Sequence, residues 1–314
     1  MGSVLNQTKQ FTPATENRAL GFGLIAVLLW STVATAFKIS LTFMDPLALV
    51  FYASIASWCV LGLILAVRKQ PISTVTTTRQ YLNALAFGLI NPTIYYLVLF
   101  QAYDRLPAQE AMAINYSWAL TLPLLAATLF KQPLNRQELL AAFISYFGIL
   151  VIATRGNLTN WSFEDPIGIA FAIASTVIWA LYWLAHARQS LDATLSLFLS
   201  FSGAIPVTGF LLYARGDWML PPIQGLLGAL YVGCFEMGIA FWCWLNAMQQ
   251  TRNTLRLSSL IFLAPPLSLL FIASIVGETI QASTVTGLAA ILCGLLIQHW
   301  IRKRQAMIDA AASH

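Results

Sequence analysis

The sequence predicts an all-α integral membrane protein, with ten transmembrane helices arranged as two inverted five-helix repeats around a central cavity. Composition is the first reason, because the 314 residues are 58% hydrophobic and only 9% charged. Soluble globular proteins are about one quarter charged. The second reason is that apolar segments of about 18 to 25 residues, long enough to cross ~30 Å of hydrocarbon, recur along the whole chain. The third is that the second half of the chain repeats the first.

The first half contains five predicted spans, each recognised by an unbroken apolar stretch between short polar connections. The second span opens at MDPLALVFYA, the third is interrupted by Asn91-Pro92, and the fourth carries NYSW followed by Pro123. Proline removes a backbone hydrogen bond and frees a carbonyl at mid-span. These five spans are residues 19–40, 47–67, 81–103, 108–130 and 137–154.

The second half contains the other five predicted spans, of which the eighth includes a glutamate and the ninth the prolines of FLAPPLSLL. They are residues 166–187, 194–214, 223–249, 255–276 and 280–301. The connections are short, so no soluble catalytic domain remains. The predicted domains are an N-terminal cytoplasmic tail (1–18), a first five-helix repeat (19–155), a second five-helix repeat (166–301) and a C-terminal cytoplasmic tail (302–314).

Basic residues concentrate on one side of this arrangement. The other side receives only Lys38, Arg105, Arg155 and Arg215, together with most of the acids. The positive-inside rule then predicts that both termini are cytoplasmic. The net charge of +5 is therefore explained by topology, and no nucleic-acid partner is expected. The basic side holds Lys9, Arg18, Arg68, Lys69, Arg79, Lys131, Arg136, Arg188, Arg252, Arg256, Arg302, Lys303 and Arg304.

The two halves align in the third and eighth spans at a constant offset. GLINPTIYYLVLFQA matches GCFEMGIAFWCWLNA, which pairs Gly88 with Gly233 and Asn91 with Glu236. With an odd number of spans per half, the second half must enter the membrane in the opposite orientation. Inverted repeats are a recurrent architecture of secondary transporters, with the substrate site near the bilayer midplane between them.

Over nearly its full length the chain resembles an EamA-type member of the drug/metabolite transporter superfamily. The resemblance rests on LLWSTVATAFKIS and MDPLALVFYA in the first half, and on FLAPPLSLL and VGETIQASTVTGLAAILCGLLI in the second. Two positions depart from the family pattern: Phe51-Tyr52-Ala53 stands where members often have an arginine, and LFKQPL lacks a counterpart of Glu278. The resemblance implies a ten-helix fold with a central cavity. It also implies export or exchange of small organic metabolites, among them amino acids, across the plasma (inner) membrane of a bacterium.

Glu236 is the leading candidate for a functional residue. An ionisable group at mid-depth costs a few kcal/mol and is by default a functional hypothesis. Apolar surroundings favour the neutral form of a carboxyl group, so a proton could bind and leave there. The alternative is a structural carboxyl, held in a fixed ion pair or hydrogen-bonded to a neighbouring helix. Asn91, its repeat mate, is either a site residue or part of a packing kink at Pro92.

Lys38 and Trp30 share one face of the first span, two helical turns apart. Lys38 could hold a substrate carboxylate or the Glu236 carboxylate, or it could extend to the membrane interface. The remaining candidates are aromatic and amide side chains that would line the cavity, whereas Trp183 and His186 are expected in the interfacial aromatic belt. These candidates are Tyr95, Asn115, Tyr116, Trp118, Trp179 and Tyr182. Aromatic walls with a few polar groups suit a bulky amino acid or an organic cation.

The predicted function is secondary active transport that exports or exchanges a small amphipathic metabolite, with proton coupling through Glu236 as a hypothesis. A passive facilitator or channel and an intramembrane enzyme are the alternatives. The sequence contains no P-loop, nucleophile motif or metal-ligand cluster, so neither enzymatic activity nor a cofactor is expected. The expected partners are a small-molecule substrate and the lipid bilayer. In the tenth span, Gly287 and Gly294 permit close helix packing, either within the chain or between two copies in a homodimer.

Overall fold

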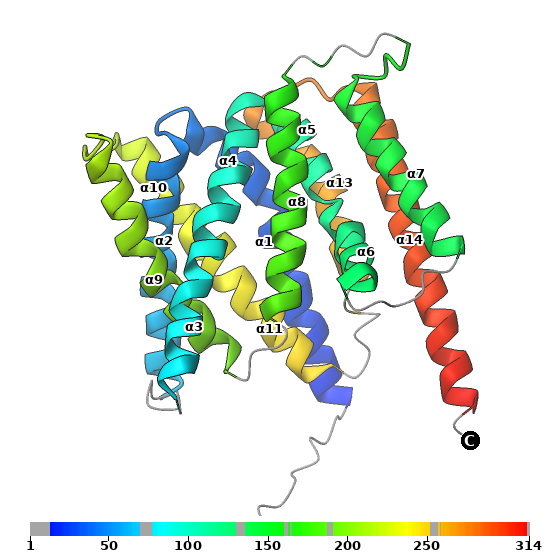
Figure 1. Cartoon of the computed structure of the whole chain (residues 1–314), viewed down its shortest axis with the longest axis horizontal. Helices are drawn as coiled ribbons and strands as arrows, with labels where there is room; N and C mark the ends of the chain where they lie inside the picture. Colours follow the sequence, from blue (N-terminus) through cyan, green and yellow to red (C-terminus); the bar gives the residue numbers. More distant parts are fainter. Residues whose placement is uncertain are drawn as a thin grey trace, which may run out of the picture.

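A computed structural model of the chain describes residues 13–69, 77–129, 136–159, 163, 165–186, 191–251, 257 and 259–312. Throughout these residues the regular secondary structure is helical (Figure 1). Nine of the described helices are long and apolar enough to cross a membrane, and Leu260–Val276 forms a shorter apolar helix at the position of the ninth predicted span. The all-helical ten-span prediction is confirmed.

In the view of Figure 1, the helices of the first half run alternately up and down through the bundle. The two ends of the bundle are called upper and lower after that view. Its third and fourth spans are each built from more than one helical segment. The elements are α1 (Pro13–Leu41), α2 (Pro46–Val67), α3 (Thr78–Gly88), η2 (Leu89–Ile94), α4 (Tyr95–Arg105), α5 (Ala108–Asn115), α6 (Trp118–Leu129) and α7 (Arg136–Ala153).

The second half begins at the upper end, opposite to the start of the first half, as expected for inverted repeats. The described start of α1 and the end of the last helix both lie at the lower end. The elements are α8 (Pro166–His186), α9 (Ala193–Ala214), α10 (Ile223–Tyr231), η3 (Val232–Ala240), α11 (Phe241–Gln250), η4 (Leu260–Leu263), α13 (Ala264–Phe271), η5 (Ile272–Val276) and α14 (Ala282–Ala312).

Helix extends into both predicted tails, because α1 begins at Pro13 and α14 continues to Ala312. Several residues singled out in the sequence lie outside the described part of the chain. They are Lys9, Lys131, Arg188, Arg252 and Arg256 among the basic residues, and most of LFKQPL.

Equivalent helices of the two halves begin in the same way. The Asp45 carboxylate accepts a hydrogen bond from the Leu47 backbone N–H at 2.9 Å and caps α2, with Pro46 in the first turn. Asp192 caps α9 in the same manner, accepting from Thr194 N–H at 3.0 Å. An acidic N-cap satisfies backbone donors that have no partner inside the helix, so both second spans start at a fixed residue.

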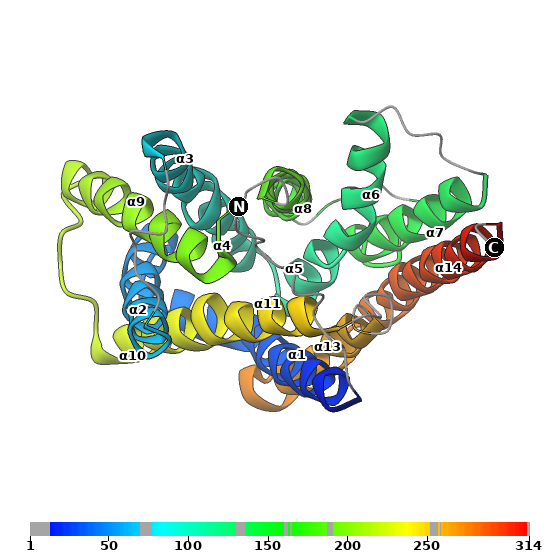
Figure 2. The ribbon, with the colours of Figure 1, turned by 90° about the horizontal axis from the view of Figure 1, so that it is seen from below.

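The helix contacts also repeat between the halves. In the first half α1 packs against α11 and α13, and its counterpart α8 packs against α4 and α6. The helices α2 and α9 pack against each other, while α3 lies on α9 and α10 on α2. Figure 2 shows the resulting cluster from the lower end, with α7 and α14 paired at one edge. The two repeats are therefore interleaved, and each completes the other's core.

The predicted repeat mates Gly88 and Gly233 occupy matching close contacts. A Cβ on Gly88 would collide with the backbone of Ser200 on α9, and a Cβ on Gly233 would collide with the backbone of Ala53 on α2. Only glycine allows these helices to approach so closely. The third and eighth spans are thus fixed against the second span of the opposite half.

The small residues of the tenth span make close helix contacts within this chain. Gly287 contacts Gly148 of α7 through the backbone, and Gly294 lies against Ser145 and Ala141. The Ser145 hydroxyl donates to the Ile291 carbonyl at 3.2 Å. Small residues and hydroxyl bonds of this kind hold membrane helices together, so this face of α14 is covered by α7.

Candidate functional site

Two matching irregular segments lie at mid-depth, one in each repeat. The π-helical segment η2 contains Asn91, and the π-helical segment η3 contains Glu236. Asn91 has non-helical backbone angles (φ −135°, ψ 117°) and precedes Pro92. π-helical insertions are frequent at functional sites. Both repeats thus depart from regular helix at the pair of residues that the sequence alignment matched.

Glu236 and Asn91 are buried polar groups with unused hydrogen-bonding capacity. Glu236 is 8% exposed, and its Oε1 accepts a hydrogen bond from the Tyr96 hydroxyl at 2.9 Å. Its second oxygen, Oε2, has no hydrogen-bond partner among the described residues, and neither has Oδ1 of Asn91. Buried polar atoms in folded proteins are nearly always paired. Each irregular segment thus carries one unpaired acceptor, Asn91 Oδ1 in η2 and Glu236 Oε2 in η3, that a ligand could engage.

A row of stacked rings runs from this region toward the lower end. Tyr95 stacks on Trp179 with centroids 4.3 Å apart, and Trp179 stacks on Tyr182 at 5.6 Å. Tyr182 in turn stacks on His186 at 5.3 Å. These four residues are called the aromatic wall. The side chain of Asn91 lies within hydrogen-bonding reach of the Tyr182 hydroxyl, which connects the wall to η2.

The aromatic wall also joins the first span and the fifth helix to the site. Phe241 contacts Trp179 at 5.6 Å and Trp30 at 5.8 Å, and Trp118 contacts Trp179 at 6.4 Å. The Asn115 amide donates to the Ser175 hydroxyl of α8 at 2.9 Å.

The side of the site formed by α1, α5 and α6 is less enclosed than the Glu236 side. Trp30, Asn115, Tyr116 and Trp118 remain partly exposed, whereas Trp179 is buried. Tyr116 lies close enough to Glu236 to interact electrostatically. The structure thus brings together every predicted site residue except Lys38.

Lys38 lies at the upper end, where its ammonium donates to the carbonyls of Tyr103 and Leu106, at 2.8 Å each. These carbonyls are at the C-terminal end of α4. A cation there is favourable for the helix dipole. In this structure Lys38 therefore contacts the α4–α5 turn, and its hydrogen bonds do not involve Glu236.

Glu278 holds the other side of the same turn. Gly277 ends the ninth span with φ +78°, a left-handed conformation that favours glycine. The Glu278 carboxylate accepts from the backbone N–H of Ala108 at 2.7 Å and from that of Gln109 at 3.2 Å. The Gln109 amide donates to the Thr279 carbonyl at 2.9 Å.

We call Lys38, Gln109 and Glu278 the upper clamp, because together they fix the α4–α5 turn between α1 and the second repeat. Nearby, Arg155 pairs with Glu110 at 2.9 Å. Lys38, Glu278, Arg155 and Glu110 thus all have partners on the protein.

Sequence reasoning missed Tyr96, Phe241 and Gln109. A signal for Tyr96 existed, because Tyr96, Phe100 and Tyr103 are spaced so that they share one helical face. No sequence signal pointed to Gln109, because its hydrogen-bond partners are about 170 positions away in the chain. His186, expected in the interfacial belt, is instead 9% exposed and stacked inside the bundle.

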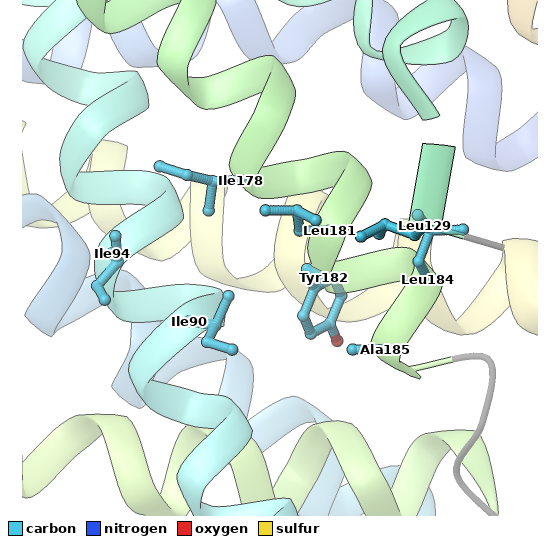
Figure 3. Close-up of a pocket in the computed structure, with 8 residues that line it drawn as sticks. All are labelled: Ile90, Ile94, Leu129, Ile178, Leu181, Tyr182, Leu184 and Ala185. Carbon is cyan, nitrogen blue, oxygen red and sulfur yellow. The ribbon is translucent and has the colours of Figure 1, made fainter. Parts of the chain in front are cut away.

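A cavity of about 600 Å³ lies beside the aromatic wall, between η2, α8 and the end of α6 (Figure 3). Its lining is aliphatic apart from Tyr182, and Ile94, Leu129 and Leu181 are exposed at its rim. Tyr182 is a member of the aromatic wall that also lines this cavity.

The chemistry of the site is that of binding. Over the described residues, no three His, Cys, Asp or Glu side chains gather as a metal site. Glu236 offers a negative charge or a proton, Asn91 offers an acceptor, and the rings offer apolar and π surfaces. Such a set has the chemical features of a pocket for a small amphipathic molecule.

Comparison with protein families gives one match that covers most of the chain. The sequence model of the EamA-like transporter family matches residues 17–154 and, a second time, residues 166–298. The two matches correspond to the two structural repeats.

Similar proteins include transporters with named substrates. The chain is 26% identical over 285 residues to the aromatic amino acid exporter YddG of Ancylobacter novellus, covering 88% of this chain and 93% of that protein. It is 24% identical over 296 residues to a probable amino-acid metabolite efflux pump of Salmonella typhimurium, covering 90% and 95%. One solved crystal structure superposes with a TM-score of 0.64 at 22% identity, over 92% of this chain and 99% of the other, and supports the fold.

Proposed function

This chain belongs to the EamA-like transporter family and is a multi-pass membrane transporter rather than an enzyme, and we propose that it exports or exchanges a small amphipathic metabolite by secondary active transport. A bulky amino acid or a similar solute is the proposed substrate class. The aromatic wall supports this proposal, as do the substrates for which two relatives are named.

The observation that carries the proposal is the half-satisfied carboxyl of Glu236 at mid-depth between the repeats. Transporters with inverted repeats place substrate and coupling-ion sites at such positions. Glu236 can be neutral in one half of the cycle and ionised in the other, which would couple substrate movement to protons. Every residue of the proposed site comes from one chain, so the proposal requires no homodimer.

We further propose that the lower end is cytoplasmic, in the inner membrane of a bacterium. Described basic residues such as Arg18, Arg79 and Arg304 lie toward this end, and the positive-inside rule favours that orientation. The upper clamp then closes the outer side. Labelling of single cysteines should find positions 104 and 217 accessible from outside and positions 79, 136 and 304 accessible from inside. The opposite result would reject this orientation.

The transport proposal is tested with the purified protein in liposomes and a panel of labelled amino acids and organic cations. An imposed pH gradient should drive uphill accumulation of at least one solute. Glu236→Gln keeps the shape of the neutral acid but cannot release a proton. The variant should still exchange labelled substrate across the membrane, and should lose accumulation against a gradient.

The matched control is Asp217→Asn, which removes an exposed carboxylate that pairs with Arg215 outside the site. It should accumulate substrate as the unchanged protein does. Undiminished uphill transport by Glu236→Gln would reject proton coupling. Flux that never exceeds equilibration, in the unchanged protein as well, would favour the passive facilitator.

A further inference from the structure

The charges around the candidate site are unequal, and this inequality bears on the substrate. The unpaired buried atoms of the described side chains include two acceptors in the irregular segments, Glu236 Oε2 and Asn91 Oδ1. Both are hydrogen-bond acceptors when Glu236 is ionised. We refer to these two atoms as the acceptor pair. At the lower end of the aromatic wall, His186 Nδ1 and the Nε1 of Trp183 are unpaired as well.

Four of the described cations have partners away from Glu236. Lys38 donates to two backbone carbonyls at the upper end, and Arg155 pairs with Glu110 at 2.9 Å. Arg105 and Arg68 lie at opposite ends of the bundle and pair with Asp165 at 3.6 Å and Asp192 at 3.9 Å. None of these four contacts involves Glu236, and the described basic side chain that lies in the aromatic wall is the imidazole of His186.

We propose that the substrate is an organic amine without a free carboxylate, whose ammonium group binds Glu236 and whose apolar body lies on the aromatic wall. This inference rests on the proposed transport function, and among small amphipathic solutes it favours an amine over the bulky amino acid named there. It separates this chain from a carrier of zwitterionic amino acids.

The physical reason is that both ends of such a molecule match the site: its ammonium group matches the Glu236 carboxylate, and its apolar body matches the aromatic wall. An ammonium group carries three donors and one positive charge, which matches an ionised carboxylate with a free oxygen. The faces of tyrosine and tryptophan also attract cations. A carboxylate on the same substrate would be placed near the like charge of Glu236, which disfavours its ionised form.

The acceptor pair belongs to the two irregular segments, which the fold holds in place. Gly88 and Gly233 fix η2 and η3 against neighbouring helices, and the Tyr96 hydroxyl orients Glu236 by binding Oε1. The free oxygen Oε2 is therefore positioned before any substrate arrives. Pre-positioned groups bind with less loss of conformational entropy.

The experiment uses four solutes with one ring system. They are 2-phenylethylamine, phenylalaninamide, phenylalanine and 3-phenylpropionate, and the full-length protein is reconstituted in liposomes. Binding is measured as competition against exchange of labelled phenylalaninamide. The two amines should bind at least tenfold more tightly than phenylalanine, and 3-phenylpropionate should not compete.

The variant Glu236→Gln tests whether the charge makes this distinction. Its preference for phenylalaninamide over phenylalanine should fall below about threefold, because the ammonium group loses its counter-charge. Asp217→Asn should keep the full preference. A preference that survives in Glu236→Gln would overturn the assignment to Glu236.

The outcomes also separate this inference from the transport function. Phenylalanine that binds and exchanges as well as its amide would overturn the amine assignment and leave the transport proposal standing. Exchange of none of the four solutes would overturn the amine assignment too. The transport proposal fails separately, if no member of its wider panel crosses the membrane.

Discussion

Ionisable side chains at the upper end of the bundle and in its middle differ in how fully the protein satisfies their hydrogen bonds. At the upper end Glu278 accepts two backbone hydrogen bonds, and Lys38 donates two. In the middle Glu236 accepts one hydrogen bond and leaves Oε2 free. Both carboxyl groups belong to the second repeat, yet only one of them is fully used by the protein itself.

This difference distinguishes a structural carboxylate, Glu278, from a candidate functional one, Glu236. A carboxylate that caps a helix and bridges two repeats holds a conformation, and its removal exposes backbone donors. A buried carboxyl with a free oxygen adds little to stability by itself. It is retained where a ligand or a proton completes its hydrogen bonding. The same reasoning applies to Asn91, whose free Oδ1 lies in the equivalent segment of the first repeat.

The largest expected effect on stability is from Glu278→Ala. The substitution leaves the N–H groups of Ala108 and Gln109 without their acceptor, at a cost of about 2–4 kcal/mol. The melting temperature in detergent should fall by at least about 5 °C. A cysteine at position 106 should also become more reactive toward a reagent added at the upper end.

The contrast with the middle of the bundle is the control for this prediction. Glu236→Gln should change the melting temperature by less than about 2 °C, because the amide can keep the hydrogen bond from Tyr96. Glu278→Gln should recover part of the loss, since its carbonyl can still accept one backbone bond. Equal destabilisation by the two glutamine variants would contradict the division between clamp and site.

The next effect concerns the aromatic wall. Trp179→Ala removes the ring that stacks on both Tyr95 and Tyr182. Affinity for a cationic aromatic substrate should fall by about 2- to 30-fold, from a ring contact of about 0.5–2 kcal/mol. The control is Trp218→Ala, because Trp218 is 59% exposed near the upper end and contacts Phe51. Equal losses in the two variants would indicate a general effect on folding.

A smaller effect is expected from Tyr96→Phe. This change removes the donor to Glu236 Oε1 and keeps the ring, for a net cost of about 0.5–1.5 kcal/mol. The exchange rate at low substrate concentration should fall about two- to tenfold. Tyr231→Phe removes a comparable hydroxyl bond, to Thr32 at 2.7 Å, away from the site. Exchange in that variant should be unchanged, and a similar loss there would argue against a specific role for Tyr96.

The fold was largely predictable because the membrane imposes strong constraints on a sequence. Length and hydropathy located the spans, and the pairing of Gly88 with Gly233 and of Asn91 with Glu236 identified the repeat. The structure places these residues in equivalent contacts and equivalent irregular segments. What the pattern could not supply was which helices would pack together, since hydropathy looks alike for every span.

The sequence predicted which residues belong to the candidate site, but not which hydrogen-bond partners they have. Buried polar side chains within an apolar span are conspicuous, so Glu236 and Asn91 could be found. The partner of Lys38 could not, because a long flexible side chain reaches several acceptors, and the choice depends on where the α4–α5 turn lies. The contact of Glu278 with Ala108 joins residues 170 positions apart, and no local pattern encodes it.

The smallest expected effect is the coupling between Lys38 and Glu236, and it tests the comparison most directly. If the two side chains formed an ion pair, Glu236→Gln would leave the Lys38 cation uncompensated, and Lys38→Met would restore the lost stability. In the structure Lys38 instead donates to the Tyr103 and Leu106 carbonyls, and its electrostatic partners are Glu278 and Asp104. Lys38→Met should therefore destabilise the protein by itself, and to the same extent in the presence of Glu236→Gln. A double-mutant cycle measured by thermal unfolding should give a coupling energy within about 0.5 kcal/mol of zero. If Lys38→Met restored the stability lost in Glu236→Gln, the two groups would interact directly. The upper clamp and the site would then not be independent.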